Sequence, residues 1–291
     1  MGAAITVVGS VNLDFVATAK TLPAPGETVT GATLARHPGG KGANQALAAT
    51  RLGADVSLIA CVGRDALADE ALALLKAEGV NLSRCLIDAK ASTGVALIAV
   101  DAKGENQIVV APGANAAFEP QHLSARIDGA LICQLEIPVE TVARAVALTD
   151  GFVGLNLAPA ADVPAELLAR ADLIVVNETE AAFYGSRLHD GGGLVAVTLG
   201  ARGAALFKAG EQIASASPPK VTAVDATGAG DSFVGALVVA LIEGQAPQDA
   251  LTFACAAGAS AATRPGAQPS LPRRVDVEAL HGALHHRTPA A

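Results

Sequence analysis

The segment Asp225-Ala226-Thr227-Gly228-Ala229-Gly230-Asp231-Ser232 comes directly before the apolar run 233–242 and decides how the chain is interpreted. Its small residues at 228–230 allow backbone N–H groups to approach a ligand closely. A helix that begins there directs unpaired N–H groups and the positive end of its dipole toward that ligand. The segment therefore predicts a site for phosphate or a developing anion. Asp231 lies in the first helical turn, beside this site, and is a candidate base.

Upstream of this segment, short apolar runs alternate with helical patterns, which predicts an α/β fold with a mostly parallel sheet and helices on both faces. We expect strands at residues 5–9, 56–61, 130–134, 152–155, 173–176 and 194–199. We expect helices at residues 42–52, 65–78, 139–148 and 164–169, and two alanine-rich helices at 228–242 and 248–263. Ligands bind such sheets at the carboxyl ends of the strands.

Two stretches, residues 12–37 and 93–112, break this alternation because they look like strands and turns without helices. We interpret them as one small β-sheet lid built from two excursions. The alternative is two ordinary hairpins that cap the main sheet. A chain of 291 residues suits a single domain with such a subdomain. From His281 onward we expect the tail to fray, with His285 and His286 exposed to solvent.

Composition argues against several classes of function. The formal charge of −8 and the lack of any basic block argue against a nucleic-acid partner. The longest strongly apolar run, residues 235–242, is too short to cross a membrane. The four cysteines include no Cys-x-x-Cys pair, so we expect reduced core thiols in a cytoplasmic protein. These features fit a protein that handles small molecules.

A second glycine-rich segment, His37-Pro38-Gly39-Gly40-Lys41-Gly42-Ala43-Asn44-Gln45, precedes a predicted helix. It is not a Walker loop, because no Ser or Thr follows the lysine at the required place. Lys41 and Asn44 are three residues apart, so the start of a helix places them near one face. An ammonium group and an amide there suit a polyhydroxylated ligand. The alternative is a glycine loop that carries a surface lysine.

Further polar residues follow the ends of predicted strands. Asn12 and Asp14 lie on one side of a strand and can fix sugar hydroxyls, although an Asp there also serves as a cap or turn residue. Glu136 lies at a carboxyl end, where ligands bind, but it can also be a surface charge. Asn177 and Glu180 have the spacing of a helix capping box. The functional alternative is that they orient water around Mg²⁺.

Six segments, in order along the chain, resemble the pfkB family of sugar and nucleoside kinases, and several are close in spelling to its ribokinases. They are Pro25-Gly26-Glu27-Thr28-Val29, residues 39–45, Asn177-Glu178-Thr179-Glu180, Thr198-Leu199-Gly200-Ala201-Arg202-Gly203, residues 225–231 and Thr263-Arg264-Pro265-Gly266-Ala267-Gln268-Pro269-Ser270. The likeness covers residues 4–272. It implies a ribokinase-like three-layer αβα sandwich with a mostly parallel central sheet and a small β-sheet lid.

The resemblance also implies an activity: ATP-dependent phosphorylation of the primary hydroxyl of a pentose, D-ribose to D-ribose 5-phosphate. One alternative is a nucleoside or other sugar kinase of the same family. An alternative of another class is a catalytically idle sugar-binding protein. Members of the family usually form a homodimer through the lid, so we expect the same here.

The same resemblance implies a role for individual residues. Asp231 would be the catalytic base, with the N–H groups of Gly228, Ala229 and Gly230 as anion hole. The sugar would be held by Asn12, Asp14, Gly40, Lys41, Asn44, Glu136 and Asp231. ATP would contact Asn177, Thr198, Gly200, Ala201, Gly203, Gly230 and Cys255. Glu180 would order the waters of Mg²⁺. K⁺ would be bound, largely through backbone carbonyls, by Asp225, Thr227, Ala261, Arg264, Gly266 and Ser270.

Three departures from the family pattern affect these expectations. Ala226 stands where the family usually has Thr, and Cys255 stands where ribokinases commonly have a residue near the adenine. The segment 181–193 is shorter than in the family and ends in Asp190-Gly191-Gly192-Gly193. We expect a missing peripheral helix and a more open sheet edge there, with consequences for stability and nucleotide affinity more than for the chemistry.

Overall fold

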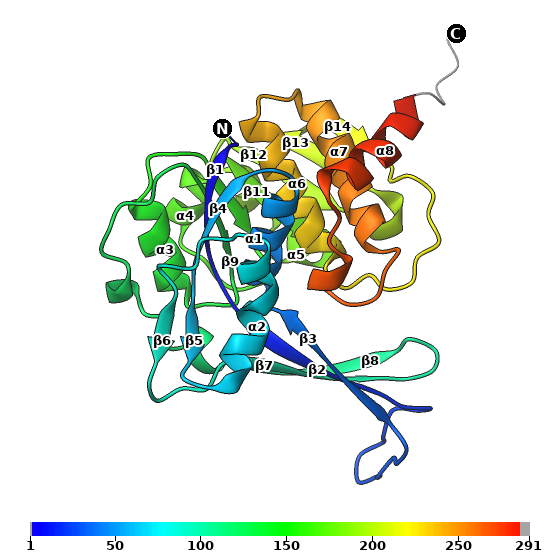
Figure 1. Ribbon diagram of the computed structural model, residues 1–291. Helices are drawn as coiled ribbons and strands as arrows, with labels where there is room; N and C mark the ends of the chain where they lie inside the picture. The colour runs from blue at the N-terminus through cyan, green and yellow to red at the C-terminus, as the bar shows by residue number, and fades with distance from the viewer. Residues whose placement is uncertain (1, 286–291) are drawn as a thin grey trace.

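The computed structural model describes residues 2–285, in which a central sheet lies between two layers of helices (Figure 1). The eight strands of the sheet follow the order β14-β13-β12-β11-β10-β9-β1-β4. Their bounds are β1 Ala4–Val8, β4 Asp55–Ile59, β9 Ala130–Gln134, β10 Val153–Asn156, β11 Leu173–Asn177, β12 Leu194–Thr198, β13 Ala204–Lys208 and β14 Glu211–Ala216. All pairs from β4 to β12 are parallel, whereas β12–β13 and β13–β14 are antiparallel. The predicted α/β fold with a mostly parallel sheet is confirmed.

The helices cover both faces of the sheet and bury one hydrophobic cluster on each. The first face carries α1 Lys41–Arg51, α2 Ala66–Ala77, α6 Ala229–Ile242, α7 Pro247–Ala261 and α8 Arg274–His285. The second face carries α3 Val139–Ala147, α4 Ala165–Arg170 and α5 Glu178–Tyr184. On β1, Ile5 and Val7 pack into the first cluster and Val8 into the second. A strand buried on both faces needs such a continuous apolar run.

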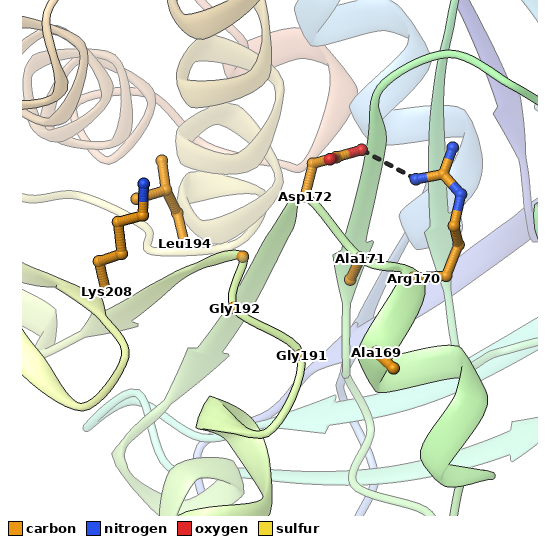
Figure 2. Close-up of a pocket in the computed structure, with 9 residues that line it drawn as sticks. Ala169, Arg170, Ala171, Asp172, Gly191, Gly192, Leu194 and Lys208 are labelled. Atoms are coloured by element: carbon orange, nitrogen blue, oxygen red, sulfur yellow. Dashed lines mark hydrogen bonds and ion pairs between the residues drawn. The ribbon is translucent and has the colours of Figure 1, made fainter.

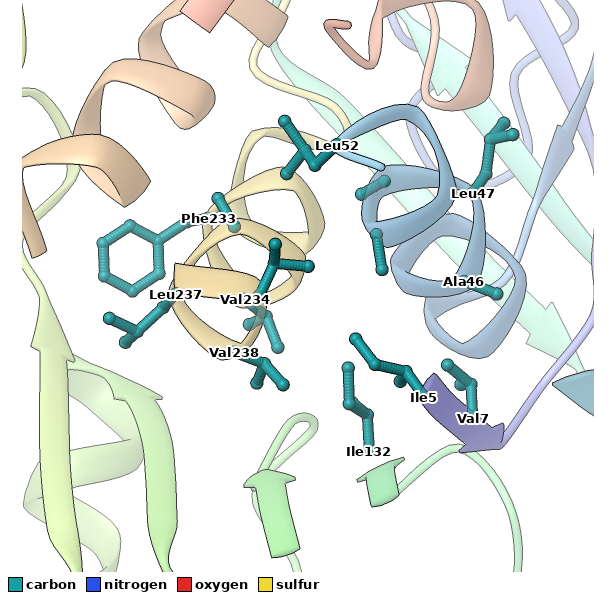
Figure 3. Packing of buried hydrophobic residues seen from close by; sticks show 14 of the residues in the cluster. Ile5, Val7, Ala46, Leu47, Leu52, Ile132, Phe233, Val234, Leu237 and Val238 are labelled. Atoms are coloured by element: carbon teal, nitrogen blue, oxygen red, sulfur yellow. The ribbon is translucent and has the colours of Figure 1, made fainter. Parts of the chain in front are cut away.

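Helices α1 and α6 lie side by side over the sheet (Figure 3). A Cβ atom on Gly235 of α6 would come within 2.9 Å of Ala48 Cβ and 3.2 Å of Ala49 N on α1, so a larger residue there would push the helices apart. Ile5 and Ile132 of the sheet face this helix pair. The small residues thus allow two helices that are distant in sequence to pack closely. This packing brings residues from the first turns of α1 and α6 together.

Residues 12–37 and 93–112 contribute to one small mixed sheet that projects from the body of the molecule (Figure 1). Its strands, in the order β3-β2-β7-β8, are β3 Thr33–Gly39, β2 Asn12–Thr18, β7 Gly94–Val100 and β8 Asn106–Ala111. The two hairpins pair side by side through the parallel strands β2 and β7, in register from Asn12 opposite Gly94. Strand β8 is exposed along its length. The small sheet expected from the sequence is therefore present.

Several elements escaped the sequence analysis. Strands β13 and β14 were not predicted, nor was the two-stranded sheet of β5 Cys61–Gly63 and β6 Leu86–Asp88. The 3₁₀ turns are Gly113–Asn115, Pro120–His122, Gly185–His189, Gly200–Arg202 and Gln268–Ser270. The expectation of a tail frayed from His281 is wrong as far as residue 285, because α8 continues to His285 and packs Val277 and Leu280 on the core. His286 lies outside the described residues.

The short connection between β11 and β12 contains α5 and the 3₁₀ turn Gly185–His189. Beyond β12 the sheet continues with β13 and β14, so β12 is not an edge strand. The missing peripheral helix and the more open sheet edge stay predictions. None of the helices in residues 2–285 has both the length and the apolar character needed to span a membrane.

Candidate active site

The two glycine-rich segments meet where α1 and α6 begin. Asp231, in the first turn of α6, is only 7% exposed. Its Oδ2 accepts a hydrogen bond from Asn44 Nδ2 on α1 at 2.8 Å. Its Oδ1 accepts one from Gln45 Nε2 at 2.9 Å. The predicted base and the predicted sugar-binding corner therefore lie within hydrogen-bond distance, although they are 187 residues apart in sequence.

The start of α6 has the backbone that an anion site needs. Gly228 caps the helix in the left-handed conformation, with φ +78° and ψ −5°, where a side chain would be strained and within 3.1 Å of the Ala267 backbone. A Cβ on Gly230 would meet nothing within 4 Å, so this residue borders open space. The Ala229 N–H donates to Ala226 O at 3.1 Å. Within residues 2–285 the N–H groups of Gly228 and Gly230 donate to no protein acceptor, so they are free for an anion.

Several charged side chains lie close to Asp231, the predicted base. Burial alone would lower the pKa of Lys41, but the carboxylates of Asp231, Glu136 and Glu180 outweigh it and raise the pKa, so the ammonium stays charged. Burial, with the added repulsion of Glu136 and Asp231, raises the pKa of Asp14 to about 7. The carboxylates of Asp231, Glu136 and Glu180 thus lie near a single lysine, Lys41. Because carboxylate oxygens accept hydrogen bonds, this corner suits a ligand that donates them.

Glu136 links three segments and is more than a surface charge. Its Oε2 accepts from Ser10 Oγ at 2.6 Å and from the Lys41 N–H, at the first residue of α1, at 3.0 Å. Gly40, with φ +87°, lies directly before Lys41. Only glycine fits there, because a Cβ would lie 2.7 Å from the Asn12 N atom. One carboxylate oxygen thus supports the helix start, and the other is left for a ligand.

Asn12 and Asp14 lie two residues apart on β2, on the same side of the small sheet, as predicted. Asn12 Oδ1 accepts from Asn115 Nδ2 at 2.8 Å, and Asn115 Oδ1 accepts from the Val11 N–H at 2.9 Å. Across the sheet, a Cβ on Gly39 would come within 2.3 Å of the Asp14 carboxylate. The hydrogen bond from Asn115 holds the Asn12 side chain before any ligand arrives, and the glycine at position 39 leaves room for the Asp14 carboxylate.

Two cavities that share Thr198, Ala226 and Gly230 extend from Asp231 over the sheet. The first, about 230 Å³, is lined by Lys41, Asn177, Glu180, Thr198, Gly228 and Asp231. The second, about 410 Å³, brings together the predicted nucleotide residues Gly200, Ala201, Gly203, Gly230 and Cys255. Its lining is predominantly apolar, with Phe233 and several residues from 218–223 completing it. Burial raises the pKa of Cys255 to about 12, so its thiol is neutral and adds to this apolar surface.

Asn177 and Glu180 form the helix capping box that their spacing indicated. Asn177 Oδ1 accepts from the Glu180 N–H at 2.9 Å, and Glu180 Oε2 accepts from the Asn177 N–H at 2.8 Å. Both side chains also line the first cavity. The capping role does not displace the functional one, because Glu180 Oε1 is not used in the box.

The residues proposed to bind K⁺ lie in the segment before α6, at the end of α7 and in the connection that follows α7. Asp225 Oδ1 accepts from the N–H and the hydroxyl of Thr227, and Oδ2 accepts from the Gly266 N–H at 2.8 Å. Burial would raise the pKa of Asp225, but these hydrogen bonds outweigh it and lower the pKa. Ser270 donates to the Ala267 carbonyl, and Arg264 approaches Asp276 at 3.9 Å. Residues 2–285 hold no cluster of three or more His, Cys, Asp or Glu arranged for a metal.

A separate hollow of about 400 Å³ lies at the amino ends of β11 and β12, next to the short segment 181–193 (Figure 2). Gly191, Gly192 and Lys208 border it, and Arg170 pairs with Asp172 at 3.0 Å. None of the predicted site residues line it. Ligands of parallel sheets bind at the carboxyl ends, so this hollow is separate from the candidate site.

The sequence analysis missed the polar residues that support the predicted ones. Ser10 and Asn115 hold Glu136 and Asn12, while Gln45 holds Asp231. Gln134 and Asn156, at the ends of β9 and β10, contact Gln45 in turn. The sequence could have indicated Gln134 and Asn156, because each ends an apolar strand at the edge where ligands bind. It could not have predicted which side chains they contact.

Comparisons with known proteins agree with this geometry. A model of the family described as pfkB family carbohydrate kinase matches residues 3–274. The ribokinase of Schizosaccharomyces pombe is 38% identical, with 94% of this chain and 96% of that protein covered. The ribokinase of Haemophilus influenzae is 37% identical, covering 93% and 95%. The Thermotoga maritima ribokinase structure has a TM-score of 0.87 at 34% identity, covering 96% of this chain and 99% of that one.

The structure of Arabidopsis thaliana ribokinase complexed with ribose and ATP has a TM-score of 0.83 at 30% identity and covers 97% of this chain and 99% of that one. The chain belongs to the pfkB family of carbohydrate kinases. It is an ATP-dependent sugar kinase, and the relatives that it resembles over nearly its whole length are ribokinases.

Proposed function

We propose that this enzyme transfers the γ-phosphoryl group of ATP to the primary hydroxyl of D-ribose and forms D-ribose 5-phosphate. The observation that carries the proposal is the contact between Asn44 and Asp231, which joins the sugar-binding corner to the base at the start of α6. The names of the relatives, and the ribose and ATP in the Arabidopsis complex, support the choice of pentose.

In the proposed step, Asp231 accepts the proton of the attacking hydroxyl. Asn12, Asp14, Gly40, Lys41, Asn44 and Glu136 hold the other sugar oxygens. Phosphoryl transfer passes through a loose transition state, so positioning and neutralisation of charge dominate. Lys41 and the free N–H groups of Gly228 and Gly230 supply that positive charge. Ala229 joins the anion hole if its turn hydrogen bond to Ala226 opens.

ATP would lie along the two cavities, with its phosphates at Asn177, Thr198 and the start of α6. Gly200, Ala201, Gly203 and Cys255 would contact the nucleoside. Glu180 fits an outer ligand of Mg²⁺, because one carboxylate oxygen remains available and Mg²⁺ keeps several of its waters. When bound, Mg²⁺ neutralises phosphate charge. K⁺ fits the segment of Asp225 and Thr227 together with the end of α7 at Ala261 and the connection that carries Arg264, Gly266 and Ser270, where the available donors are largely carbonyls.

The small sheet would serve as the lid over the sugar and as the contact surface of a homodimer. Leu34, Leu97, Ile108, Val109 and Val110 are all at least half exposed on it. Strand β8 also leaves an edge unpaired, which favours pairing with a second copy. A cytoplasmic location fits the four free cysteines and the need for ATP.

A coupled ADP-release assay over D-ribose, 2-deoxyribose, other pentoses and adenosine tests the proposal. D-ribose is expected to give the highest kcat/KM, and mass spectrometry should place the phosphate on the primary hydroxyl. A preference for adenosine would instead show a nucleoside kinase. Sugar binding by calorimetry without ATP binding or turnover would show an idle binding protein.

A further inference from the structure

The carboxylate of Asp231 has a second support that lies outside the cavities. Gln45 is fully buried and follows Asn44 on α1. Its Nε2 donates both to Asp231 Oδ1 at 2.9 Å and to Asn156 Oδ1 at 3.0 Å. Both N–H groups of this amide are therefore used. Both partners are protein groups, so Gln45 can hold Asp231 whether or not ligands are bound.

The orientation of the Gln45 amide is set by another buried glutamine. Gln134, at the end of β9, is 1% exposed and donates from Nε2 to Gln45 Oε1 at 2.6 Å. If the Gln45 amide turned over, its oxygen would face the Asp231 carboxylate and Asn156 Oδ1, and both contacts would become repulsive. The bond from Gln134 therefore determines which end of Gln45 faces the base.

Gln134 is held in this position at a cost to stability. Its Oε1 has no hydrogen-bond partner among the described residues and is buried. There is room for that oxygen only because residue 9 is glycine, since a Cβ there would lie 2.1 Å from it. An apolar residue of the same size would avoid the unpartnered oxygen. A buried polar group that is only partly satisfied calls for an explanation beyond packing.

We propose that Gln134 and Gln45 form an amide relay whose role is to position the carboxylate of Asp231 for proton transfer. The inference rests on the proposed role of Asp231 as base. Gln45 and Gln134 are positioning residues, because both are at most 1% exposed and Gln45 uses its amide N–H groups and its Oε1 on protein partners. Gln134 reaches Asp231 only through Gln45. Loss of Gln134 should therefore have no further effect once Gln45 is replaced.

The test compares Gln45→Met, Gln134→Met and the double variant, each nearly equal in volume to glutamine but unable to form the bonds. Single-turnover phosphorylation of D-ribose by ATP avoids limits set by product release. A misplaced base is expected to lower the rate about 10- to 100-fold in each single variant. The KM values for ribose and ATP should stay within about twofold, because ground-state contacts are intact. The double variant should be no slower than Gln45→Met alone.

Matched controls separate this role from a structural one. Thr149→Val removes the buried hydroxyl that accepts from the Gly151 N–H just before the amino end of β10, at the opposite edge of the sheet from the site, and should lower the melting temperature but not the rate. If Gln134→Met does not fold, Gln134→Asn retains an amide that is too short to reach Gln45, with the same expected rate loss. Equal rates in wild type and the Gln134 variant, or additive losses in the double variant, would overturn the relay. If Asp231→Asn keeps full activity, the proposed base is wrong, which is a different failure.

Discussion

The two halves of the proposed active site differ in composition. The proposed sugar half consists of ionisable and amide side chains, and hydrogen bonds to distant segments hold Glu136 and Asp231 in it. The proposed nucleotide half is a mostly apolar cavity of glycine, alanine and proline, with Phe233 and the buried Cys255. Buried polar groups depend on their partners, whereas a cavity wall mainly provides shape. Single substitutions should therefore damage the sugar half far more than the nucleotide half.

Asp231→Asn should have the largest effect, because the amide cannot accept the hydroxyl proton. Loss of a general base is expected to lower kcat about 10²- to 10⁴-fold. The affinity for ATP, measured by calorimetry, should hold, because the second cavity does not depend on this carboxylate. A variant that keeps more than about a tenth of wild-type kcat would contradict the base assignment.

Gly228→Ala tests the junction between the halves. The residue has φ +78°, and the added methyl would press on the Ala267 backbone at 3.1 Å, so the N–H groups at the start of α6 should shift. Loss of an anion-hole donor is expected to lower kcat about 10²- to 10³-fold.

Gly185→Ala is the matched control for this substitution. Gly185 also has positive φ, +58°, but a Cβ there meets nothing within 4 Å, and the residue is far from the start of α6 in the chain. Its variant should be the more strained of the two in thermal unfolding, because ψ −139° at Gly185 lies outside the left-handed region that Gly228 occupies, yet kcat should not change. Equal kinetic losses in the two variants would mean that strain, not the anion hole, accounts for the effect.

Asp14→Asn probes the charge shared within the sugar half. Folding raises the pKa of Asp14 from 3.8 to about 7. The folded chain thus holds the proton more tightly, and ionised Asp14 destabilises the fold above pH 7 but not below the unfolded pKa. The variant should melt at a higher temperature than wild type at about pH 8, and this gain should shrink as the pH falls from about 7 to about 4.

Activity supplies the second readout for Asp14. The KM for ribose should rise about 10-fold or more, as expected for loss of a charged hydrogen-bond partner. The KM for ATP should not change. A stability gain that is independent of pH would show that Asp14 is not the group that titrates.

Much of the fold was predictable because its strands are apolar runs bounded by glycines and helical patterns. Strand β9, residues 130–134, has the predicted bounds. Strands β13 and β14 escaped because alanine, which favours helix, supplies two residues each of Ala204–Lys208 and Glu211–Ala216. They became strands because β12 offers an unpaired edge. Helix α8 escaped because its two core contacts, Val277 and Leu280, are weak signals without the partner surface.

The site was predictable only in its outline. The rule that ligands gather at carboxyl ends places Glu136 and Asn177 near one another, and family resemblance adds Lys41, Asn44 and Asp231. Gln134, which contacts Gln45 across 89 residues, shows what was out of reach. Its importance comes from a partner that local sequence does not identify. Resemblance identifies the residues that touch ligands more readily than those that hold them in place.

Cys255→Ala should have the smallest effect of these substitutions and tests the nucleotide half of the comparison. The thiol is neutral and buried, with its Sγ at 3.7 Å from the Ala216 carbonyl, and its contribution to the nucleotide cavity is apolar contact. Removing one such group costs about 0.8 kcal/mol, which corresponds to about a fourfold rise in KM for ATP. Because Cys255 lies away from the reacting groups, kcat and the KM for ribose should not change. A kcat loss like that of Gly228→Ala would show that the nucleotide half also positions the γ-phosphate, and the division between side-chain and backbone recognition would then fail.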